Sequence, residues 1–317
     1  MRLFALLFAA LLSVAAQAQS YPNRPVRFIV SFPPGGSSDL IARMIAPRMA
    51  ERMGQPVLVE NRPGGGGNIG VDAVAKAPPD GYTIGLAAAG ALSSNISLYP
   101  SMPFHPEKDL APITMLAIIP FFLVAHPSQP ATLKELIDAA KAKPGTIAVG
   151  YGGNGSTMHL AGELFNMLAG IRLQPVPYKG SGPVSTDVLG GQVPLGVVDV
   201  PSAIAHVRAG KMRALAVTSK RRIVAAPEVP TFEEAGVPGY EAIGWFGSVA
   251  PAGTPAEIIN RLNREMAAAL AEPEIRERAL AAGAEPFTNS PQEFAAIIRE
   301  ETRKWAQVIR SAGIKLQ

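Results

Sequence analysis

Two glycine-rich loops carry the residues of this chain that are best suited to binding an anion. The first covers residues 32–39, with the sequence FPPGGSSD, between an expected buried strand at residues 26–31 and the start of a helix. Glycines let a ligand approach the backbone closely, and the first N–H groups of a helix have no partners within it. Those donors and the positive end of the helix dipole favour a carboxylate or a phosphate. Because the loop contains no obvious nucleophile or metal ligand, it predicts binding rather than catalysis.

The same layout recurs in the second half of the chain. Residues 147–151 are expected to form a strand, and residues 152–157, with the sequence GGNGST, lead from it into a helix. The apolar positions expected on the inner face of that helix are Leu160, Leu164, Phe165 and Leu168. If the two units face each other, they form a cleft with a helix N-terminus on each wall. The sequence therefore predicts a two-sided anion site.

Four polar residues near these loops are further candidates. Asp39 either caps its own helix or contacts a polar group of the ligand, directly or through water. His159 lies one turn into the second helix and could line the cleft, although a capping or surface role is the default interpretation. Lys179 follows a strand and either places an ammonium group at the cleft mouth or is solvated. Asp199 ends an apolar strand, where an acid is uncommon unless it makes a hydrogen bond.

Other motifs do not favour a cofactor, a metal or catalysis. Residues 65–70 (GGGNIG) match the dinucleotide pattern G-x-G-x-x-G, but residues 86–90 (LAAAG) lack the acid that such a site uses for the ribose. A tight turn at a helix start is the preferred interpretation. The 4 histidines show no metal-ligand spacing, and no G-x-S-x-G elbow occurs. We therefore predict no catalytic residue, metal or cofactor; a periplasmic enzyme is the alternative, because triads assemble from distant residues.

The first 18 residues have the features of an export signal. Arg2 precedes an apolar run at residues 3–16, and the ending Ala16-Gln17-Ala18 predicts cleavage after Ala18. The run is too short to favour the alternative, a transmembrane anchor. These features predict an exported protein.

Composition narrows the location and the partners. The chain has no cysteine, which excludes disulfides, thiolate metal sites and a lipidated N-terminal cysteine. An exported protein without a lipid is best explained as a soluble protein of the periplasm. The formal charge of +4 becomes +3 when Arg2 leaves with the signal, and no basic run with interleaved aromatic residues occurs. Nucleic acid is therefore not an expected partner.

Strand-like and helix-like segments alternate along nearly the whole chain, which predicts an α/β fold with mostly parallel sheets. About 300 mature residues exceed what one hydrophobic core usually organises, so we expect two lobes. The expected boundaries place residues 19–122 and 248–317 in lobe 1 and residues 123–247 in lobe 2.

Several helix starts can be located from the sequence. The first helix is expected over residues 37–53, before Gly54, and Pro47 is expected to kink or split it. Capping boxes at residues 132–135, 254–257 and 290–293 predict further helices. The last two of these helices are expected to pack the lobes together rather than to bind a ligand.

Several stretches, in order along the chain, resemble the extracytoplasmic solute receptors of tripartite tricarboxylate transporters, the Bug family: FPPGGSSDLIAR, VENRPGGGGNIG, PDGYTIG, GNGSTMHLAGELF, VPYKG, GKMRALAVTS, VPTFEEAGVPGYE and APAGTP. The likeness covers essentially all of the mature chain. It implies a two-lobed periplasmic binding protein of the type II fold, with a cleft that closes by a hinge on a small carboxylate. It also implies delivery to the membrane permease of such a transporter. We expect a monomer, and a sensor of the same ligand is an alternative.

In that family, backbone amides and ordered waters from two loops hold one carboxylate of the ligand. Carried over by position, the expected contacts are Pro34, Gly35, Gly36, Ser37, Asp39, Gly155, Ser156 and Thr157, with Ala89, Gly90, Ala91 and Asp199 nearby. His159 and Lys179 complete the set of candidates. The sequence does not identify the carboxylate, because its specificity has to come from side chains of distant loops that meet its other end.

Overall fold

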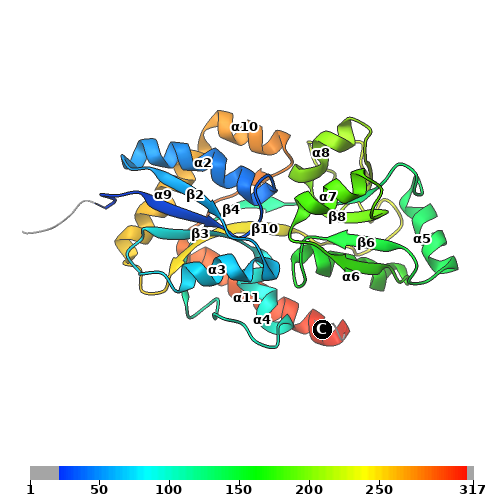
Figure 1. Cartoon of the computed structure of the whole chain (residues 1–317), viewed down its shortest axis with the longest axis horizontal. Coiled ribbons are helices and arrows are strands. Elements are labelled where there is room, and N and C mark those ends of the chain that lie inside the picture. Colours follow the sequence, from blue (N-terminus) through cyan, green and yellow to red (C-terminus); the bar gives the residue numbers. More distant parts are fainter. Residues whose placement is uncertain (1–20, 313–317) are drawn as a thin grey trace, which may run out of the picture.

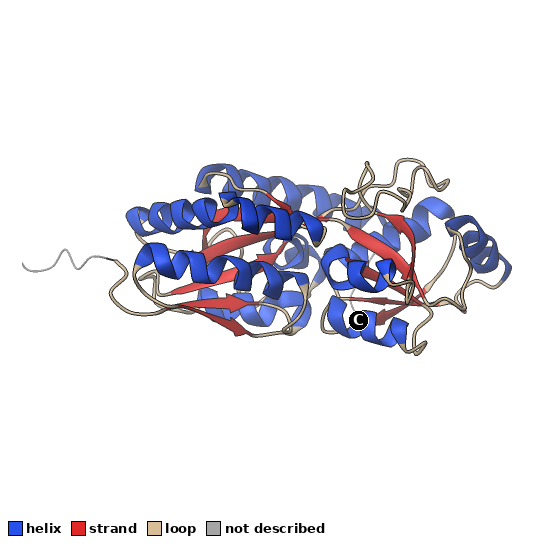
Figure 2. Ribbon diagram, turned by 90° about the horizontal axis from the view of Figure 1, so that it is seen from above, coloured by secondary structure: helices blue, strands red, loops and turns tan. Residues whose placement is uncertain are grey.

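Two β-sheets, each with helices on both faces, form two lobes in the computed structural model, which describes residues 21–312 (Figures 1 and 2). The predicted signal at residues 1–18 lies outside the described residues. The first sheet has the order β11-β4-β10-β3-β1-β2. Its strands are β1 (Val26–Val30), β2 (Val57–Asn61), β3 (Thr83–Ala88), β4 (Leu110–Ile119), β10 (Gly244–Pro251) and β11 (Glu285–Pro286).

The second sheet has the order β7-β6-β8-β5-β9. Its strands are β5 (Phe121–Ala125), β6 (Ala148–Tyr151), β7 (Gln174–Pro177), β8 (Leu195–Asp199) and β9 (Arg213–Val217). The expected α/β fold with two lobes is confirmed.

The prediction of mostly parallel sheets is wrong. β1 pairs in parallel with β2 and β3, and β6 does so with β7 and β8. The strands that carry the chain between lobes, β5 and β10, pair antiparallel with both of their neighbours. These two strands enter their sheet from the other lobe and run against their two neighbours, and β11 also pairs antiparallel with β4.

Helices cover both faces of the first sheet, and the strand residues alternate between them. The helices of this lobe are α2 (Ser37–Met53), α3 (Asn68–Ala75), α4 (Asn95–Leu98), α9 (Ala256–Ala271), α10 (Pro273–Ala281) and α11 (Pro291–Ala312), with short turns η1 (Gly65–Gly67) and η2 (Gly90–Ser94). Phe28 and Val30 pack into the core that contains residues of α2 and α9, whereas Ile29 packs with residues of α3 and α11. Burial on both faces explains why Phe28, Ile29 and Val30 are consecutive apolar residues, whereas Arg27 near the start of β1 is exposed.

Helices cover the second sheet in the same way. They are α5 (Leu133–Ala142), α6 (Thr157–Ala169), α7 (Ser181–Leu189) and α8 (Val200–Arg208). Leu136 of α5 and Phe165 of α6 share a core with Leu123, whereas Val184 of α7 and Ile204 of α8 pack with Phe122. Leu160 and Phe165 are buried as expected, but Leu168 is 40% exposed, so its predicted inward position is wrong.

Helix α2 begins and ends where the sequence predicts. It ends at Gly54, which adopts a left-handed conformation with φ 70° and donates its N–H to the Ala50 carbonyl. Of the two effects expected of Pro47, a split is wrong, since α2 continues through it, and a kink stays a prediction. Neighbouring residues Ile45 and Met49 are fully buried, and this packing compensates for the hydrogen bond that a proline removes.

The three predicted capping boxes have different outcomes. The box at Thr132 forms, with its side chain accepting from the Glu135 N–H and the reverse bond present. In the box that precedes α11, Ser290 and Glu293 accept each other's N–H groups. The box at Thr254 does not form, because the Thr254 hydroxyl donates to the Pro251 carbonyl and α9 begins after Pro255.

Two crossings connect the lobes. β4 ends at Ile119 in the first sheet and β5 begins at Phe121 in the second, with Pro120 between them. The chain returns to the first sheet at Gly244, where β10 begins. The lobe boundaries at residues 122/123 and 247/248 stay predictions.

The end of α11 contacts both lobes. Trp305 and Ile309 form a small core with Leu98 from the first lobe and Leu160 from the second. The predicted packing role of this helix is consistent with these contacts.

Candidate functional site

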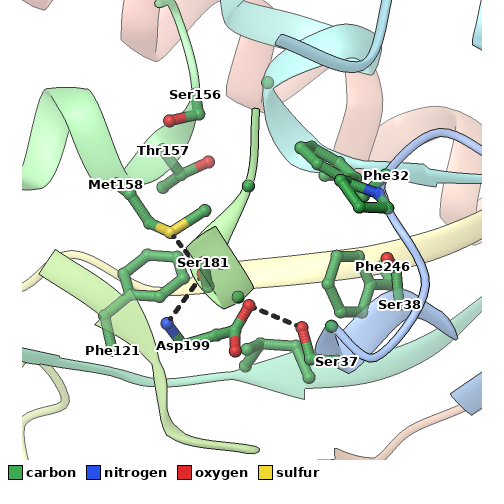
Figure 3. A pocket seen from close by; sticks show the side chains of 18 of the residues that line it. Phe32, Ser37, Ser38, Phe121, Ser156, Thr157, Met158, Ser181, Asp199 and Phe246 are labelled. Carbon is green, nitrogen blue, oxygen red and sulfur yellow. Dashed lines mark hydrogen bonds between the residues drawn. The ribbon is translucent and has the colours of Figure 1, made fainter. Parts of the chain in front are cut away.

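A pocket lies between the lobes at the point where helices α2, α6, α7 and α8 begin (Figure 3). The residues that precede these helices, Gly36, Ser156, Gly180 and Asp199, all line it. The first N–H groups of a helix have no carbonyl partner within the helix. The pocket therefore collects backbone donors and the positive ends of helix dipoles from both lobes.

The structure brings about half of the predicted contacts into this pocket. Those that line it are Pro34, Gly36, Ser37, Gly90, Ser156, Thr157 and Asp199. Those that do not are Gly35, Asp39, Ala89, Ala91, Gly155, His159 and Lys179. The second group has other contacts, described below, and its predicted part in ligand binding stays a prediction.

Asp39 does not line the pocket but makes a hydrogen bond to the backbone of the first loop. It is 4% exposed, and its carboxylate accepts hydrogen bonds from the Gly35 N–H at 3.0 Å, the Arg43 Nε at 2.9 Å and the Asn61 amide at 3.0 Å. Burial alone raises the pKa of Asp39, but the bonds from Arg43, Gly35 and Asn61 outweigh it, so the pKa lies below its usual value. An ionised Asp39 thus fixes the loop conformation, including Gly35 with its φ of 82°.

Asp199 joins the two lobes. The Ser37 hydroxyl of the first lobe donates to its Oδ2 at 2.7 Å (Figure 3). The Ser202 N–H donates to its Oδ1 at 3.1 Å as α8 begins. The Asp199 N–H in turn donates to the Ser181 hydroxyl at 3.2 Å. The sequence predicted that an acid at the end of an apolar strand makes a hydrogen bond, and these contacts of Asp199 confirm it.

Glycines let the lobes approach each other backbone to backbone beside the pocket. Tyr99 of the first lobe donates to the Asn154 carbonyl at 2.6 Å, and Ser94 donates to the Gly155 carbonyl at 3.3 Å. A Cβ atom on Gly155 would lie 2.6 Å from the Asn95 Oδ1, and one on Gly90 would lie 3.0 Å from the Gly155 carbonyl. The contact between lobes thus requires these positions to have no side chain. Ala89 and Ala91 are buried in the adjacent core.

His159 supports the second loop. Its Nδ1 accepts the Gly155 N–H at 3.3 Å, and its ring stacks on Tyr151 with centroids 4.5 Å apart. Burial lowers the pKa of His159 to about 4, so the ring is neutral near pH 7. It is 7% exposed and acts as an acceptor for the loop backbone.

Lys179 lies in a neighbouring outer pocket. That pocket is also lined by Tyr99, Asn154 and the glycines of η1, and it shares Phe32 and Gly66 with the inner pocket. The Lys179 side chain is exposed. Its exposure fits the solvated alternative stated above, and a role for its ammonium group at the cleft mouth stays a prediction.

The sequence did not locate the apolar walls of the inner pocket or the start of α7. The walls include Phe32, Phe121, Phe246, Ile119 and Met158, and the α7 segment adds Gly180, Ser181, Gly182 and Pro183. The wall residues come from strands and loops far apart in the chain, so no local pattern identifies them. The stretch Gly180-Ser181-Gly182-Pro183 resembles the other two loops in composition. This likeness could have predicted a third helix start at the pocket.

The lining of the inner pocket includes one charged side chain, Asp199, and no lysine, arginine or histidine. Among residues 21–312, no group of three or more metal-ligating side chains is suitably placed for a metal ion. The donors among the lining residues include backbone N–H groups, the hydroxyls of serine and threonine, and the Trp245 indole N–H, which has no partner within the described residues. This arrangement can bind an anion without a cationic side chain.

Two α/β lobes joined by two crossings, with a pocket between them where helices begin, define a solute-binding protein. Residues 41–314 match the family described as the tripartite tricarboxylate transporter family receptor. The chain belongs to this family. Its members are periplasmic receptors, and no helix in the described part of this chain is apolar over a membrane-spanning length.

Similar proteins agree with this assignment. Protein BugT of Bordetella pertussis (strain Tohama I) is 42% identical over 315 residues, which cover 98% of this chain and 97% of BugT. The R. palustris protein Rpa4515 with adipate is 38% identical, with a TM-score of 0.90 over 93% of this chain and 99% of that one. MatC from Rhodopseudomonas palustris with bound malate is 32% identical, with a TM-score of 0.87 over 91% of this chain and 100% of MatC.

Proposed function

We propose that this protein is a periplasmic receptor that closes its two lobes on a small carboxylate and delivers it to a membrane permease. The observation that carries the proposal is the convergence of the α2, α6 and α7 N-termini on one pocket between the lobes. Each helix start contributes roughly half a positive charge together with free N–H donors. Adipate and malate, named with two similar structures, are both carboxylates.

In this proposal the ligand carboxylate accepts hydrogen bonds from the first N–H groups of two facing helices. The donors are those of Ser37 and Ser38 on α2 and of Thr157 and Met158 on α6. The Ser156 hydroxyl accepts the His159 N–H at 3.2 Å. In this proposal the Ser156 side chain therefore serves mainly to cap the start of α6. The crossings at residues 119–121 and 218–243 would act as the hinge.

Export and the absence of catalysis belong to the same proposal. We infer that residues 1–18 are removed and that the mature protein begins at residue 19 in the periplasm. Mass spectrometry of the protein secreted from the full-length gene tests this, because cleavage at another position gives a different mass. The bound carboxylate should leave the protein with its mass unchanged, and a new product would reverse the conclusion that no reaction is catalysed.

A ligand screen by thermal unfolding tests the binding function. A carboxylate at a hundredfold excess over its Kd adds about 2.7 kcal/mol to the free energy of unfolding, which gives a clear rise in Tm. Mono-, di- and tricarboxylates, amino acids and neutral sugars form the panel. The proposal fails if no carboxylate raises the Tm while a neutral sugar does.

The variant Gly36→Val tests the loop assignment. A Cβ on Gly36 would contact only the Pro33 carbonyl at 3.7 Å, so the fold accommodates a side chain there. Because Gly36 lines the pocket, valine fills the space beside the α2 donors and should abolish the Tm shift. The matched control is Gly162→Ala in α6, where the added Cβ meets only Val197 at 3.9 Å outside the pocket. Unchanged affinity in Gly36→Val contradicts the assignment.

A further inference from the structure

We propose that the start of α7, with Ser181 and Gly182, and the indole of Trp245 form a second subsite of the inner pocket, which binds a second carboxylate of the ligand. This inference rests on the function proposed above, which places the first carboxylate at the starts of α2 and α6. It goes further by naming the residues that bind the far end of the ligand and the chemical class that they select, a dicarboxylate.

The start of α7 has backbone donors that the first carboxylate does not use. Gly180, Ser181 and Gly182 line the pocket, and Gly180, which precedes the helix, provides no side-chain cap. Among the hydrogen bonds of residues 21–312, none is donated by the N–H groups of Ser181 or Gly182. The first turn of α7 contains no acidic residue. The positive end of this helix is therefore available to an anion.

The Ser181 hydroxyl can donate to the same anion. Ser181 is 4% exposed, its oxygen accepts the Asp199 N–H at 3.2 Å, and it donates to the Met158 sulfur at 3.1 Å (Figure 3). A thioether sulfur is a weak acceptor, whereas a carboxylate oxygen is a strong one. A ligand carboxylate at the start of α7 would therefore take the place of the sulfur as the acceptor of this hydroxyl.

An indole N–H at the inner pocket also lacks an acceptor. Trp245 lines the pocket and is 6% exposed, and its Nε1 is buried with no hydrogen-bond partner in the described part of the chain. Trp245 also lines a surface hollow beside the exposed side chains of Phe287 and Lys304. Water would reach an N–H group that faced this hollow, so we assign the buried nitrogen to the inner pocket. A buried donor without an acceptor is costly, and a ligand oxygen would remove that cost.

The number of donors indicates that the second acceptor is a carboxylate. One carboxylate accepts about four hydrogen bonds, and the N–H groups assigned to the first carboxylate, two on α2 and two on α6, already fill these positions. The donors of α7 and Trp245 therefore need another acceptor. A hydroxyl or ketone oxygen accepts only about two hydrogen bonds, which is fewer than these donors can make. A second carboxylate accepts enough of them, and its charge is favoured by the α7 dipole.

Asp199 does not exclude a second carboxylate from this pocket. Its own charge is stabilised by protein groups, since the Ser37 hydroxyl donates to Oδ2 and the Ser202 N–H at the start of α8 donates to Oδ1. Each carboxylate would then lie at a helix start, Asp199 at α8 and the two ligand groups at α2 with α6 and at α7. Helix starts thus stabilise all three charges without a cationic side chain.

Matched ligands test the proposal on the wild-type protein. Isothermal titration calorimetry would compare succinate, glutarate and adipate with butanoate, pentanoate and hexanoate, which have the same carbon chains but a single carboxylate. We expect the tightest dicarboxylate to bind at least tenfold more tightly than the monocarboxylate of its length. Monocarboxylates that bind as tightly, in this series or in the thermal screen, overturn this proposal but leave the proposed function intact. If no carboxylate binds in either experiment, the proposed function itself fails.

Two variants with matched controls test the residues of the second subsite. Trp245→Phe keeps an aromatic ring but removes the indole N–H. Its control is Trp305→Phe, because the Trp305 N–H donates to Glu301 outside the pocket. Gly182→Pro removes one free N–H in the first turn of α7, where a helix tolerates proline. Its control is Gly182→Ala, because a Cβ at this position meets no atom within 4 Å.

Each test variant should lower the affinity for the tightest dicarboxylate about tenfold, whereas each control should stay within about twofold of the wild type. Wild-type affinity in either test variant overturns the proposal. An equal loss for the monocarboxylate of the same length also overturns it, since the effect would then belong to the pocket as a whole. Circular dichroism and the Tm of each ligand-free variant show whether the fold is retained. If Gly182→Pro disturbs the fold, Ser181→Ala, which removes only the hydroxyl, takes its place with the same expected loss.

Discussion

Replacing Gly155 with alanine should weaken ligand binding by preventing the lobes from closing fully. The new Cβ would lie 2.6 Å from the Asn95 Oδ1 and 2.8 Å from the Tyr99 ring, both on the opposite lobe. Relief of this overlap separates the two surfaces and breaks the bonds from Ser94 to Gly155 and from Tyr99 to Asn154. At about 1 kcal/mol for each bond, the closed form loses about 2 kcal/mol. Because only the closed form encloses the ligand, its affinity should fall about thirtyfold.

Gly155 also has a φ of 79°, so alanine strains the loop in the open and closed forms alike. Gly170→Ala controls for this strain, because Gly170 has a φ of 62° at the end of α6 and open space around its Cβ position. Both variants should lose about 1 kcal/mol of stability, but only Gly155→Ala should lose affinity. Calorimetry with the tightest carboxylate of the screen measures affinity, and small-angle X-ray scattering measures the contraction on binding. Wild-type affinity and contraction in Gly155→Ala would refute the reasoning.

Three other predictions concern stability and closure. His159 has a pKa of about 4 when folded and 6.5 when unfolded, so its contribution to stability is complete above pH 6.5 and declines as the pH falls toward 4. Urea unfolding should show a loss of up to about 3 kcal/mol over this range, and His159→Gln should reduce the loss; an identical pH profile would contradict this. Ser37→Ala removes the hydrogen bond to Asp199 between the lobes, which costs the closed form about 2 kcal/mol and should lower the affinity for the ligand about thirtyfold. Calorimetry measures this affinity, and an unchanged value would exclude the contribution of the bond. Trp305→Ala empties the small core that α11 shares with both lobes, at a cost of about 3 kcal/mol in urea unfolding, whereas the exposed Arg303→Ala should cost less than 0.5 kcal/mol.

Local features of the sequence predicted the helices and loops well, because they depend on neighbouring residues. The end of α2 at Gly54 follows from the left-handed conformation that glycine tolerates, and the box at Thr132 follows from residues three apart. The direction of β5 and β10 was missed, since a strand's own residues do not reveal which lobe it arrives from. The two glycine-rich loops were expected to face each other, and both line the pocket.

The remainder of the site depends on contacts between distant residues. Asp39 and His159 have suitable side chains close to the loops, but the structure turns them toward the loop backbone rather than the pocket. Phe32, Phe121 and Phe246 look like ordinary core residues in the sequence, and only the arrangement of strands brings them to one cavity. Position within the fold, rather than residue type, separates the residues that line the pocket from those that support it.

Backbone dipoles in place of cationic side chains have a consequence for the conditions in which the receptor works. Salt screens charges on mobile, exposed side chains over about 8 Å at physiological ionic strength, but it acts weakly on groups enclosed between two lobes. The proposed donors on α2 and α6 are fixed in position, and the bound ligand would be separated from the surrounding ions. Capture of the carboxylate should therefore depend little on ionic strength, so that the receptor can collect its ligand in fresh water and in brine alike.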